Sequence, residues 1–388
     1  MQASLLGGGD VLGVFGKNSG SVRLDLAAAE EAGLPKASID RLRITEKSLA
    51  AMIAGVRQVR DLPQPLGEIL REWSRPNGIK ITKLRVPLGV IAIIFESRPN
   101  VTIDAAVLCL KTGNATVLRG GREAIHSNRA LIAAVHQCAS LPKGAVQLVA
   151  DTDRSLVTFL CKQSDLIDVI IPRGGHSLIE TVVAESRIPV IKHSHGVCSA
   201  FVHEAADLEM AEKIVLNAKV QRPGVCNAIE TLLIDRKIAA KAVPLVGGAL
   251  LKAGVEVRGD DEVRRRLKGE RVVSASEADW TTEYLDFVIA ARVVDGLDGA
   301  LQHLAKYSSH HSDVIITTDT TIAERFLNEV DSATVYWNAS TRFTDGGEFG
   351  FGAEIGISTD KLHARGPMGL DELTSYKFLI RGDGQVRS

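Results

Sequence analysis

The feature that most constrains the fold is the run Val90-Ile91-Ala92-Ile93-Ile94-Phe95. It is short, mostly β-branched and apolar at every position, which is typical of a strand buried on both faces of a sheet. A sheet with two buried faces needs helices packed on both sides. This run therefore predicts an α/β fold with parallel strands.

Short apolar runs and helical patterns alternate along the rest of the chain. Strands are expected at 79–86, 90–95, 115–118, 146–149, 168–171, 190–191, 231–234, 287–293, 313–317, 333–337 and 374–380. Helical patterns cover 24–70, interrupted by Pro63 and Pro65, and then 104–111, 123–138, 207–217 and 238–251. Alternation at this spacing predicts parallel, helix-flanked sheets. With 388 residues the chain is too long for one comfortable core, so two α/β domains are expected, the second series beginning after about Val202.

Charge and composition exclude several classes of protein. Forty-six basic residues oppose 47 acidic ones, a balance that argues against a nucleic-acid or membrane-surface protein. No stretch approaches the roughly 20 apolar residues of a membrane span. The segment 1–16 lacks a basic flank and contains Asp10, so a signal peptide is not expected. A cytoplasmic protein without membrane or nucleic-acid partners is expected.

The five cysteines are dispersed, odd in number and without a Cys-x-x-Cys pair, which argues against a disulfide framework or a structural zinc site. His193-Ser194-His195 has a spacing that could bind a metal, but no third ligand accompanies it, so no metal is expected. Solvated or hydrogen-bonded histidines are the simpler interpretation.

Cys226 stands in the run Gln221-Arg222-Pro223-Gly224-Val225-Cys226-Asn227, just before an apolar strand. A Pro-Gly turn could present this thiol at the edge of a sheet, with Arg222 as a nearby cation that favours the thiolate. Without further evidence, however, a free cysteine is more often a buried side chain that only packs in the core. Cys109, Cys138 and Cys161 are expected in the core, and Cys198 is ambiguous.

Two basic, glycine-containing turns follow apolar strands and precede helices. They are Arg119-Gly120-Gly121-Arg122 and Arg173-Gly174-Gly175. Glycine lets backbone amides approach a ligand, a helix N-terminus favours an anion, and arginine can grip a phosphate with two hydrogen bonds. The dinucleotide fingerprint Gly-x-Gly-x-x-Gly is absent, so a nucleotide site and two ordinary connections remain equally open.

Several long segments together resemble the gamma-glutamyl phosphate reductases, a family of the aldehyde dehydrogenase superfamily that is also described as glutamate-5-semialdehyde dehydrogenase. The resemblance extends from about Leu24 to the C-terminus. Its most specific runs are Val86–Ile91, Phe95–Ala106, Leu108–Lys111, Gly113–Ala115, Leu118–Gly121, Leu216–Lys219, Gln221–Ala228, Asn338–Gly346 and Leu362–Gly369.

The resemblance implies an aldehyde dehydrogenase-like fold. Two α/β domains would consist of an NADPH-binding domain over 1–203 and a catalytic cysteine domain over 204–370. A C-terminal strand and tail over 371–388 would pair with the strand at 79–86 in a small element that mediates homo-oligomer formation.

The resemblance also implies a reaction, the NADPH-dependent reduction of L-glutamate 5-phosphate to the 5-semialdehyde, the second step of proline biosynthesis. Cys226 would attack the acyl carbon and release phosphate, and the thioacyl enzyme would then be reduced. Asn100, which follows the buried strand, matches the asparagine that stabilises the oxyanion in related enzymes. The upstream glutamate 5-kinase is a candidate partner.

By the same resemblance, cofactor contacts are expected from both Arg-Gly-Gly turns and from a glutamate near the nicotinamide ribose; these residues are Arg119, Gly120, Gly121, Arg122, Arg173, Gly174, Gly175 and Glu283. Either Arg119 or Arg122 could meet the 2′-phosphate of NADPH. Substrate contacts are expected from Arg98, Arg222, Ser340 and Thr341, although 340–345 could equally be a structural loop.

Oxidising aldehyde dehydrogenases need a glutamate base that activates water, in a Glu-Leu-Gly-Gly motif before the cysteine. The matching stretch here is His193-Ser194-His195-Gly196, which has no glutamate. A reductive enzyme that starts from an acyl phosphate needs no such base, so this absence favours reduction. An NAD-dependent oxidising semialdehyde dehydrogenase and a catalytically silent assembly partner remain the alternatives.

Overall fold

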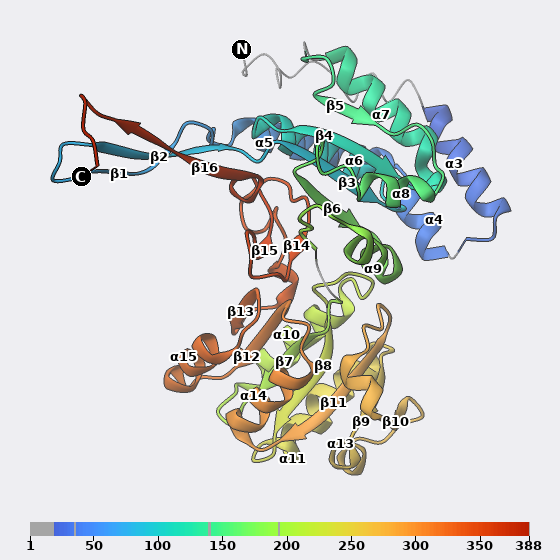
Figure 1. The fold of residues 1–388 in the computed structure, drawn as a ribbon. Coiled ribbons are helices and arrows are strands. Elements are labelled where there is room, and N and C mark those ends of the chain that lie inside the picture. The colour runs from blue at the N-terminus through green and yellow to red at the C-terminus, as the bar shows by residue number, and fades with distance from the viewer. Residues whose placement is uncertain (1–18, 35, 139–140, 193–194, 388) are drawn as a thin grey trace. The chain divides into compact units, whose positions relative to one another are not determined.

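The computed structural model describes residues 19–34, 36–138, 141–192 and 195–387. The chain divides into two compact units, whose elements are labelled in Figure 1. The first unit runs up to Lys192 and adds Gly350–Gly356 and the chain from Pro367 onward. The second unit runs from His193 to Phe349 and adds Ile357–Gly366.

The first unit contains a four-stranded parallel sheet in the order β5-β4-β3-β6. Its strands are β3 (Val90–Phe95), β4 (Ala115–Gly120), β5 (Val146–Leu148) and β6 (Val169–Arg173). Its helices are α6 (Asn100–Lys111), α7 (Ile125–Cys138), α8 (Ser155–Leu160) and α9 (His176–Glu185), with the 3-10 turn η1 (Arg122–Ala124). Residues 91–95 of β3 are completely buried, as the uniformly apolar run predicts. Val190 forms only an isolated bridge to Ile170, so the short strand predicted at 190–191 is wrong.

The helical pattern over 24–70 corresponds to three helices and the start of a strand. The helices are α3 (Ser19–Glu31), α4 (Lys36–Leu42) and α5 (Glu46–Asp61). Ile69 and Leu70, predicted to be helical, instead begin β1 (Ile69–Ser74). A helix does not continue through Pro63 and Pro65, and the extended chain beyond them pairs with β2.

A separate three-stranded antiparallel sheet has the order β1-β2-β16. Its central strand is β2 (Lys80–Pro87) and its other edge is β16 (Thr374–Arg381), drawn in blue and red as long ribbons in Figure 1. The predicted pairing of the strand near 79–86 with the C-terminal strand is confirmed, with Tyr376 opposite Arg85 and Ile380 opposite Ile81.

The second unit is built on a seven-stranded parallel sheet in the order β10-β9-β11-β8-β7-β12-β13. The strands are β7 (Cys198–Val202), β8 (Ile229–Asp235), β9 (Glu256–Gly259), β10 (Val272–Ser274), β11 (Val288–Val294), β12 (Ser312–Ile316) and β13 (Thr334–Trp337). Four of them confirm predicted strands. The strands β7, β9 and β10 were not predicted.

Helices of the second unit are α10 (Leu208–Val220), α11 (Ala239–Ala242), the π-helical turn η2 (Val243–Gly247), α12 (Gly248–Lys252), α13 (Asp261–Arg266), α14 (Gly296–Tyr307) and α15 (Thr320–Glu329). Shorter pieces complete the chain: η3 (Glu277–Thr281), η4 (Thr341–Phe343), β14 (Ile357–Ser358), β15 (Gly366–Pro367) and η5 (Asp371–Leu373). The helix predicted over 238–251 is interrupted at η2, where Pro244 cannot donate the usual backbone hydrogen bond.

The unit boundary at Lys192/His193 precedes β7, which is completely buried between β8 and β12. The sequence-based division at 203/204 assigns this strand to the first domain instead, because it starts the second series only after Val202. No helix among the described residues is long and apolar enough to cross a membrane.

Candidate active site

Cys226 lies in the loop that connects α10 to β8, and its side chain is half-buried. The end of α10 from which the loop starts is buried at Val215, Ala218 and Lys219. The loop ends in β8, a strand that is buried throughout. Both ends of the cysteine loop are therefore anchored in the core of the second unit.

Asn227, the residue after the cysteine, ties this loop to η4. Its side-chain amide donates to the carbonyl of Thr344 at 2.8 Å, and its own backbone carbonyl accepts from the Thr341 hydroxyl at 2.7 Å. Arg342 donates to the Asn227 side-chain oxygen and also to Gln221 at 2.8 Å. Asn227 and Thr341 are buried, so these bonds are shielded from water and hold the loop in one conformation.

The backbone of Cys226 packs against the segment 196–198. A Cβ atom on Gly196 would overlap the carbonyl and Cα of Cys226, so only glycine permits this approach. The Cys198 thiol donates to the Cys226 carbonyl at 3.1 Å. Burial raises the pKa of Cys198 well above its usual value, so this thiol stays protonated and serves as a donor. Glu283 accepts the Gly196 amide at 3.0 Å and so lies beside the same segment.

A completely buried ion pair flanks the cysteine loop. Lys219, near the end of α10, donates to Glu230, at the start of β8, over 2.5 Å. Both side chains have zero exposure. Burial raises the pKa of Glu230 to about 7 and lowers that of Lys219, each opposed by the charge of its partner.

The carboxyl edge of the four-stranded sheet carries both Arg-Gly-Gly turns, as predicted, on β4 and β6 either side of β3. Residues after β3 bond to each turn. Glu96 accepts the Gly175 amide at 3.2 Å, and Glu123 accepts the Ser97 amide at 2.6 Å and its hydroxyl at 3.1 Å. Ser97 adopts a left-handed conformation with φ of 49°. Three neighbouring turns are thus cross-linked at one sheet edge.

Neighbouring side chains lie close to three of the glycines in these turns. A Cβ on Gly174 would lie 2.6 Å from both Glu96 Oε2 and Leu178 Cδ2. A Cβ on Gly120 would overlap the Asn128 side chain, and one on Gly121 would overlap the carboxylate of Glu123. Gly121 and Gly175 also cap η1 and α9, and neither offers a side-chain acceptor to the first helix amides.

The arginines of the two turns differ in their surroundings. Arg119 is buried and donates to the carbonyls of Thr152 and Asp153 at 2.8 and 3.1 Å. Burial lowers its pKa. Arg122 is exposed. The Nε atoms of Arg119 and Arg173 are both buried and have no hydrogen-bond partner among the described residues, which suits a site that a polar ligand completes.

Asn100 is the first residue of α6 and its side chain is exposed. Its side-chain nitrogen donates to Asp104 Oδ2 at 3.0 Å, one helical turn along. Burial raises the pKa of Asp104 to about 6, opposed by the hydrogen bond from Asn100 and the charge of Arg173. One amide proton of Asn100 is therefore engaged and the second can be directed at a ligand.

A model of the aldehyde dehydrogenase family matches residues 45–286 of this chain. The gamma-glutamyl phosphate reductase of Moorella thermoacetica is 53% identical over 366 residues, which cover 94% of this chain and 87% of that protein. The protein of the same name from Opitutus terrae is 55% identical over 372 residues, which cover 94% and 88%. The crystal structure of the Thermotoga maritima gamma-glutamyl phosphate reductase superimposes with a TM-score of 0.94 at 43% identity, covering 100% of this chain and 94% of that one.

The chain belongs to the gamma-glutamyl phosphate reductase family. Membership follows from identities above half over nearly the whole chain. It confirms both the family resemblance found in the sequence and the aldehyde dehydrogenase-like α/β fold. It also makes this chain a member of an oxidoreductase family.

The residues that the sequence nominated for this family's site fall into two groups. The first unit carries Arg98, Asn100, Arg119, Gly120, Gly121, Arg122, Arg173, Gly174 and Gly175 around one sheet edge. In the second unit Glu283 bonds to Gly196, which packs on the Cys226 backbone, and Thr341 bonds to Asn227, the residue after the cysteine. Arg222 is exposed at the start of the loop. Thr341 is completely buried, and Ser340 caps η4 by accepting the Arg342 amide. Both side chains therefore hold the backbone of the segment 340–345 and of its neighbours in place. His193 and Ser194 lie outside the described residues.

Sequence reasoning did not single out the residues that hold the cysteine and the sheet edge. They are Asp104, Glu123, Cys198 bonding to Cys226, Lys219, Asn227, Glu230 and Arg342. One signal was available for Asp104, because positions four apart share a helix face. The other pairs join residues distant in sequence or act through backbone groups, which a residue pattern does not reveal.

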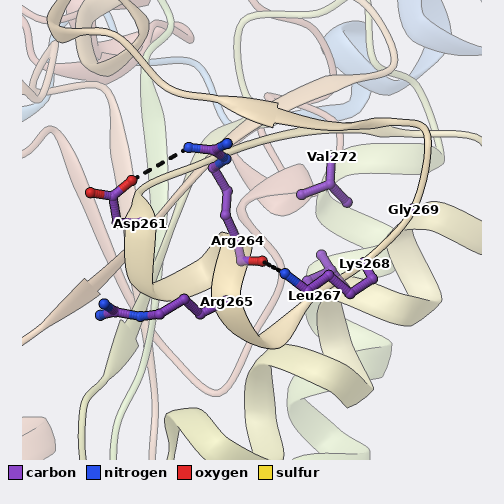
Figure 2. A pocket seen from close by; sticks show the side chains of 7 residues that line it. All are labelled: Asp261, Arg264, Arg265, Leu267, Lys268, Gly269 and Val272. Carbon is purple, nitrogen blue, oxygen red and sulfur yellow. Dashed lines mark hydrogen bonds and ion pairs between the residues drawn. The ribbon is translucent and has the colours of Figure 1, made fainter.

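A further pocket of about 380 Å³ lies around α13 and is shown in Figure 2. Its seven lining residues are Asp261, Arg264, Arg265, Leu267, Lys268, Gly269 and Val272. Arg264 pairs with Asp261 at 3.4 Å, and Lys268 donates to the Arg264 carbonyl at 2.8 Å. The pocket includes none of the residues nominated from sequence. Across the described ranges, no group of three or more ligating side chains could hold a metal ion.

Proposed function

We propose that the chain catalyses the NADPH-dependent reduction of L-glutamate 5-phosphate to L-glutamate 5-semialdehyde and inorganic phosphate, in the biosynthesis of proline. The observation that carries this proposal is Cys226 on a loop fixed at both ends, in a chain whose close relatives are named gamma-glutamyl phosphate reductase. A thiolate can displace phosphate from an acyl phosphate, and a nicotinamide can then reduce the thioester that forms.

In the first step the Cys226 sulfur attacks the acyl carbon, the carbon–oxygen bond to phosphate breaks, and inorganic phosphate leaves. Bound NADPH supplies the hydride that converts the resulting thioester to aldehyde and free thiolate. Asn100 and the Cys226 backbone amide would donate to the developing oxyanion, with Asp104 orienting the amide of Asn100. Arg98 and Arg222 are the candidate partners of the substrate's anionic groups.

The dinucleotide would bind at the carboxyl edge of the four-stranded sheet, where the glycine turns and the first amides of α9 lie. The residues fit such a group, because Gly174 and Gly175 leave no side chain over the amides and Arg173 Nε is unpartnered. Glu283 would hold the nicotinamide ribose. Since Arg119 is engaged with backbone carbonyls, Arg122 is the better candidate for the 2′-phosphate.

The three-stranded sheet would mediate homo-oligomer formation. Tyr376, Phe378 and Ile380 alternate along the edge strand β16 and are 49%, 52% and 66% exposed. Large apolar side chains on an unpaired edge strand favour association with another chain. Phe378→Lys with Ile380→Lys should shift sedimentation toward the monomer. Unchanged sedimentation would remove this part of the proposal.

The decisive experiment follows NADPH oxidation with L-glutamate 5-phosphate for wild type, Cys226→Ser and Cys161→Ala, the last replacing a buried thiol of the first unit. Serine is a poor nucleophile at neutral pH, so Cys226→Ser should lose at least ~10³-fold in kcat while Cys161→Ala stays active. Oxidation of the semialdehyde to free glutamate without phosphate dependence would instead indicate the oxidising dehydrogenase. No turnover by wild type in either direction would favour the silent assembly partner.

A further inference from the structure

The buried pair Lys219–Glu230 has no role in the reaction described above, yet it lies at the base of the cysteine loop. Lys219 is in the last turn of α10 and Glu230 is the second residue of β8, so the two side chains join the chain immediately before and after the loop. Both have zero exposure. Removing two charges from water is costly, and well-packed apolar residues usually stabilise a core equally well. A contribution to stability alone therefore does not explain why these two charged residues are buried here.

The second carboxylate oxygen of Glu230 makes a different contact. While Oε2 accepts from Lys219, Oε1 accepts the backbone amide of Leu285 at 3.2 Å. Leu285 has φ of 54°, in the left-handed region that a side chain larger than glycine's disfavours. A bond from a buried carboxylate to this amide helps to hold the unfavourable conformation.

The held segment reaches the cysteine by a short series of contacts. Glu283, two residues before Leu285, accepts the Gly196 amide, and Gly196 packs on the Cys226 backbone. Lys219 Nζ also lies 6.0 Å from the ring centre of Tyr284. The Glu230 carboxylate therefore links the two ends of the cysteine loop to the segment 283–285.

We propose that Lys219 and Glu230 are positioning residues, which set the segment 283–285 against the cysteine loop through the Glu230–Leu285 hydrogen bond. Lys219 turns Glu230 by donating to Oε2, so that its other oxygen, Oε1, faces the Leu285 amide. The pair acts through Cys226 and Glu283 and touches neither substrate nor cofactor. The inference rests on the proposed function only in taking Cys226 as the reacting thiol and Glu283 as a cofactor contact.

Two double variants separate positioning from stability. Lys219→Met with Glu230→Gln removes both charges but keeps an oxygen that can accept the Leu285 amide. Lys219→Met with Glu230→Leu removes both charges and the acceptor. Leu304→Ala is the control, because it opens a cavity in the packing of α14, in a different core cluster, and lowers stability without contacting the loop.

Three measurements are made on each folded full-length variant. They are the melting temperature, the pH profile of Cys226 alkylation by iodoacetamide read by peptide mass spectrometry, and the kcat and KM for NADPH. The Gln double variant should remain within about fivefold of wild type in kcat, and the Leu double variant should lose ~100-fold, as expected for small displacements of reacting groups. The Leu variant should also show an altered alkylation profile and a higher KM for NADPH.

The proposal is overturned if the Leu double variant keeps the wild-type alkylation profile and kcat, or if the Gln and Leu variants lose activity equally. It is also overturned if Leu304→Ala, at a matched melting temperature, reproduces the altered alkylation profile. Alkylation reports on Cys226 without any substrate. A fully active Cys226→Ser would therefore refute the proposed function while leaving the comparison of alkylation profiles interpretable.

Discussion

The carboxyl edge of the four-stranded sheet and the cysteine loop of the seven-stranded sheet hold their polar groups in different ways. At the sheet edge, the carboxylates of Glu96 and Glu123 accept backbone amides of neighbouring turns, and exposed Arg122 lies beside them. In the cysteine loop two of the holding side chains, those of Asn227 and Thr341, are themselves buried. An edge built on backbone amides can adjust to a ligand, whereas a loop bonded to a packed core is held in one geometry.

The difference matches what each region is proposed to do. Binding a dinucleotide tolerates small shifts, because affinity is spread over many contacts. Nucleophilic attack depends on the position of a single sulfur atom, where small displacements are costly. Substitutions should therefore affect chiefly turnover at the loop and chiefly cofactor affinity at the edge.

The strongest test of this contrast is Gly196→Ala. The added Cβ would overlap the Cys226 carbonyl, so the cysteine backbone must shift. We expect kcat to fall on the order of 10²-fold, with a smaller change in the KM for NADPH. Steady-state kinetics measure both constants. Gly347→Ala, on an exposed loop, is the matched control. An active Gly196→Ala enzyme would mean that the loop is more adaptable than its contacts suggest.

Thr341→Val tests whether buried bonds hold the loop. Valine has nearly the same shape as threonine but leaves the Asn227 carbonyl without the donor that lies 2.7 Å away. Loss of one buried partner costs roughly 1–3 kcal/mol, so both the unfolding free energy and kcat should fall. Denaturant titration and kinetics provide the measurement. Thr341→Ser keeps the hydroxyl and should remain close to wild type; a loss in Thr341→Ser as large as in Thr341→Val would show that the hydroxyl alone does not hold the loop.

Glu123→Ala examines the sheet edge. It removes the acceptor of the Ser97 amide and hydroxyl and frees the turn after β4. We expect the dissociation constant of NADPH to rise about tenfold, equivalent to ~1.4 kcal/mol, with kcat changed little. Fluorescence titration of bound NADPH measures this constant. If kcat fell more than affinity, the proposed division between the edge and the loop would be wrong.

His303 provides a way to perturb the second unit away from the cysteine, with the smallest expected effect on turnover. Burial, aided by Arg292, lowers its pKa to about 4 from an ordinary 6.5. The unfolded chain thus binds a proton between these values and the folded chain does not. The contribution of neutral, buried His303 to the free energy of unfolding is complete above pH 6.5 and is lost as the pH falls toward 4.

The expected loss is on the order of 2 kcal/mol, since each pKa unit corresponds to about 1.4 kcal/mol and packing relaxes partly. His303→Gln should flatten the decline in melting temperature between pH 6.5 and 4 and leave kcat at neutral pH unchanged. The same slope in wild type and variant would assign the acid sensitivity to other groups.

Much of the fold could be predicted because its strands are distinctive. The uniformly apolar run at 90–95 became the buried strand β3, and the Arg-Gly-Gly turns lie on either side of β3 at one sheet edge. The strand β7 was missed although Ala200, Phe201 and Val202 are apolar, because it has only five residues and Ser199 interrupts its apolar pattern. β9 and β10 contain charged or polar residues and are short, so their pattern is weak.

The candidate site could be predicted only in part. Cys226 and the glycine turns stand in recognisable runs, whereas their supports do not. Glu123 reaches Ser97 across 26 positions, and Gly196 reaches Glu283 across 87. Thr341, nominated as a substrate contact, is completely buried and bonds to the loop.

The sequence by itself determined the family, the alternation of strands and helices, and the identity of the reactive cysteine candidate, because these depend on local residue patterns. The tertiary structure alone decided which groups hold that cysteine. Lys219 and Glu230 pair, Cys198 donates to the Cys226 carbonyl, and Gly196 leaves room for it, since hydrogen bonds and close packing depend on distances that only the folded chain defines.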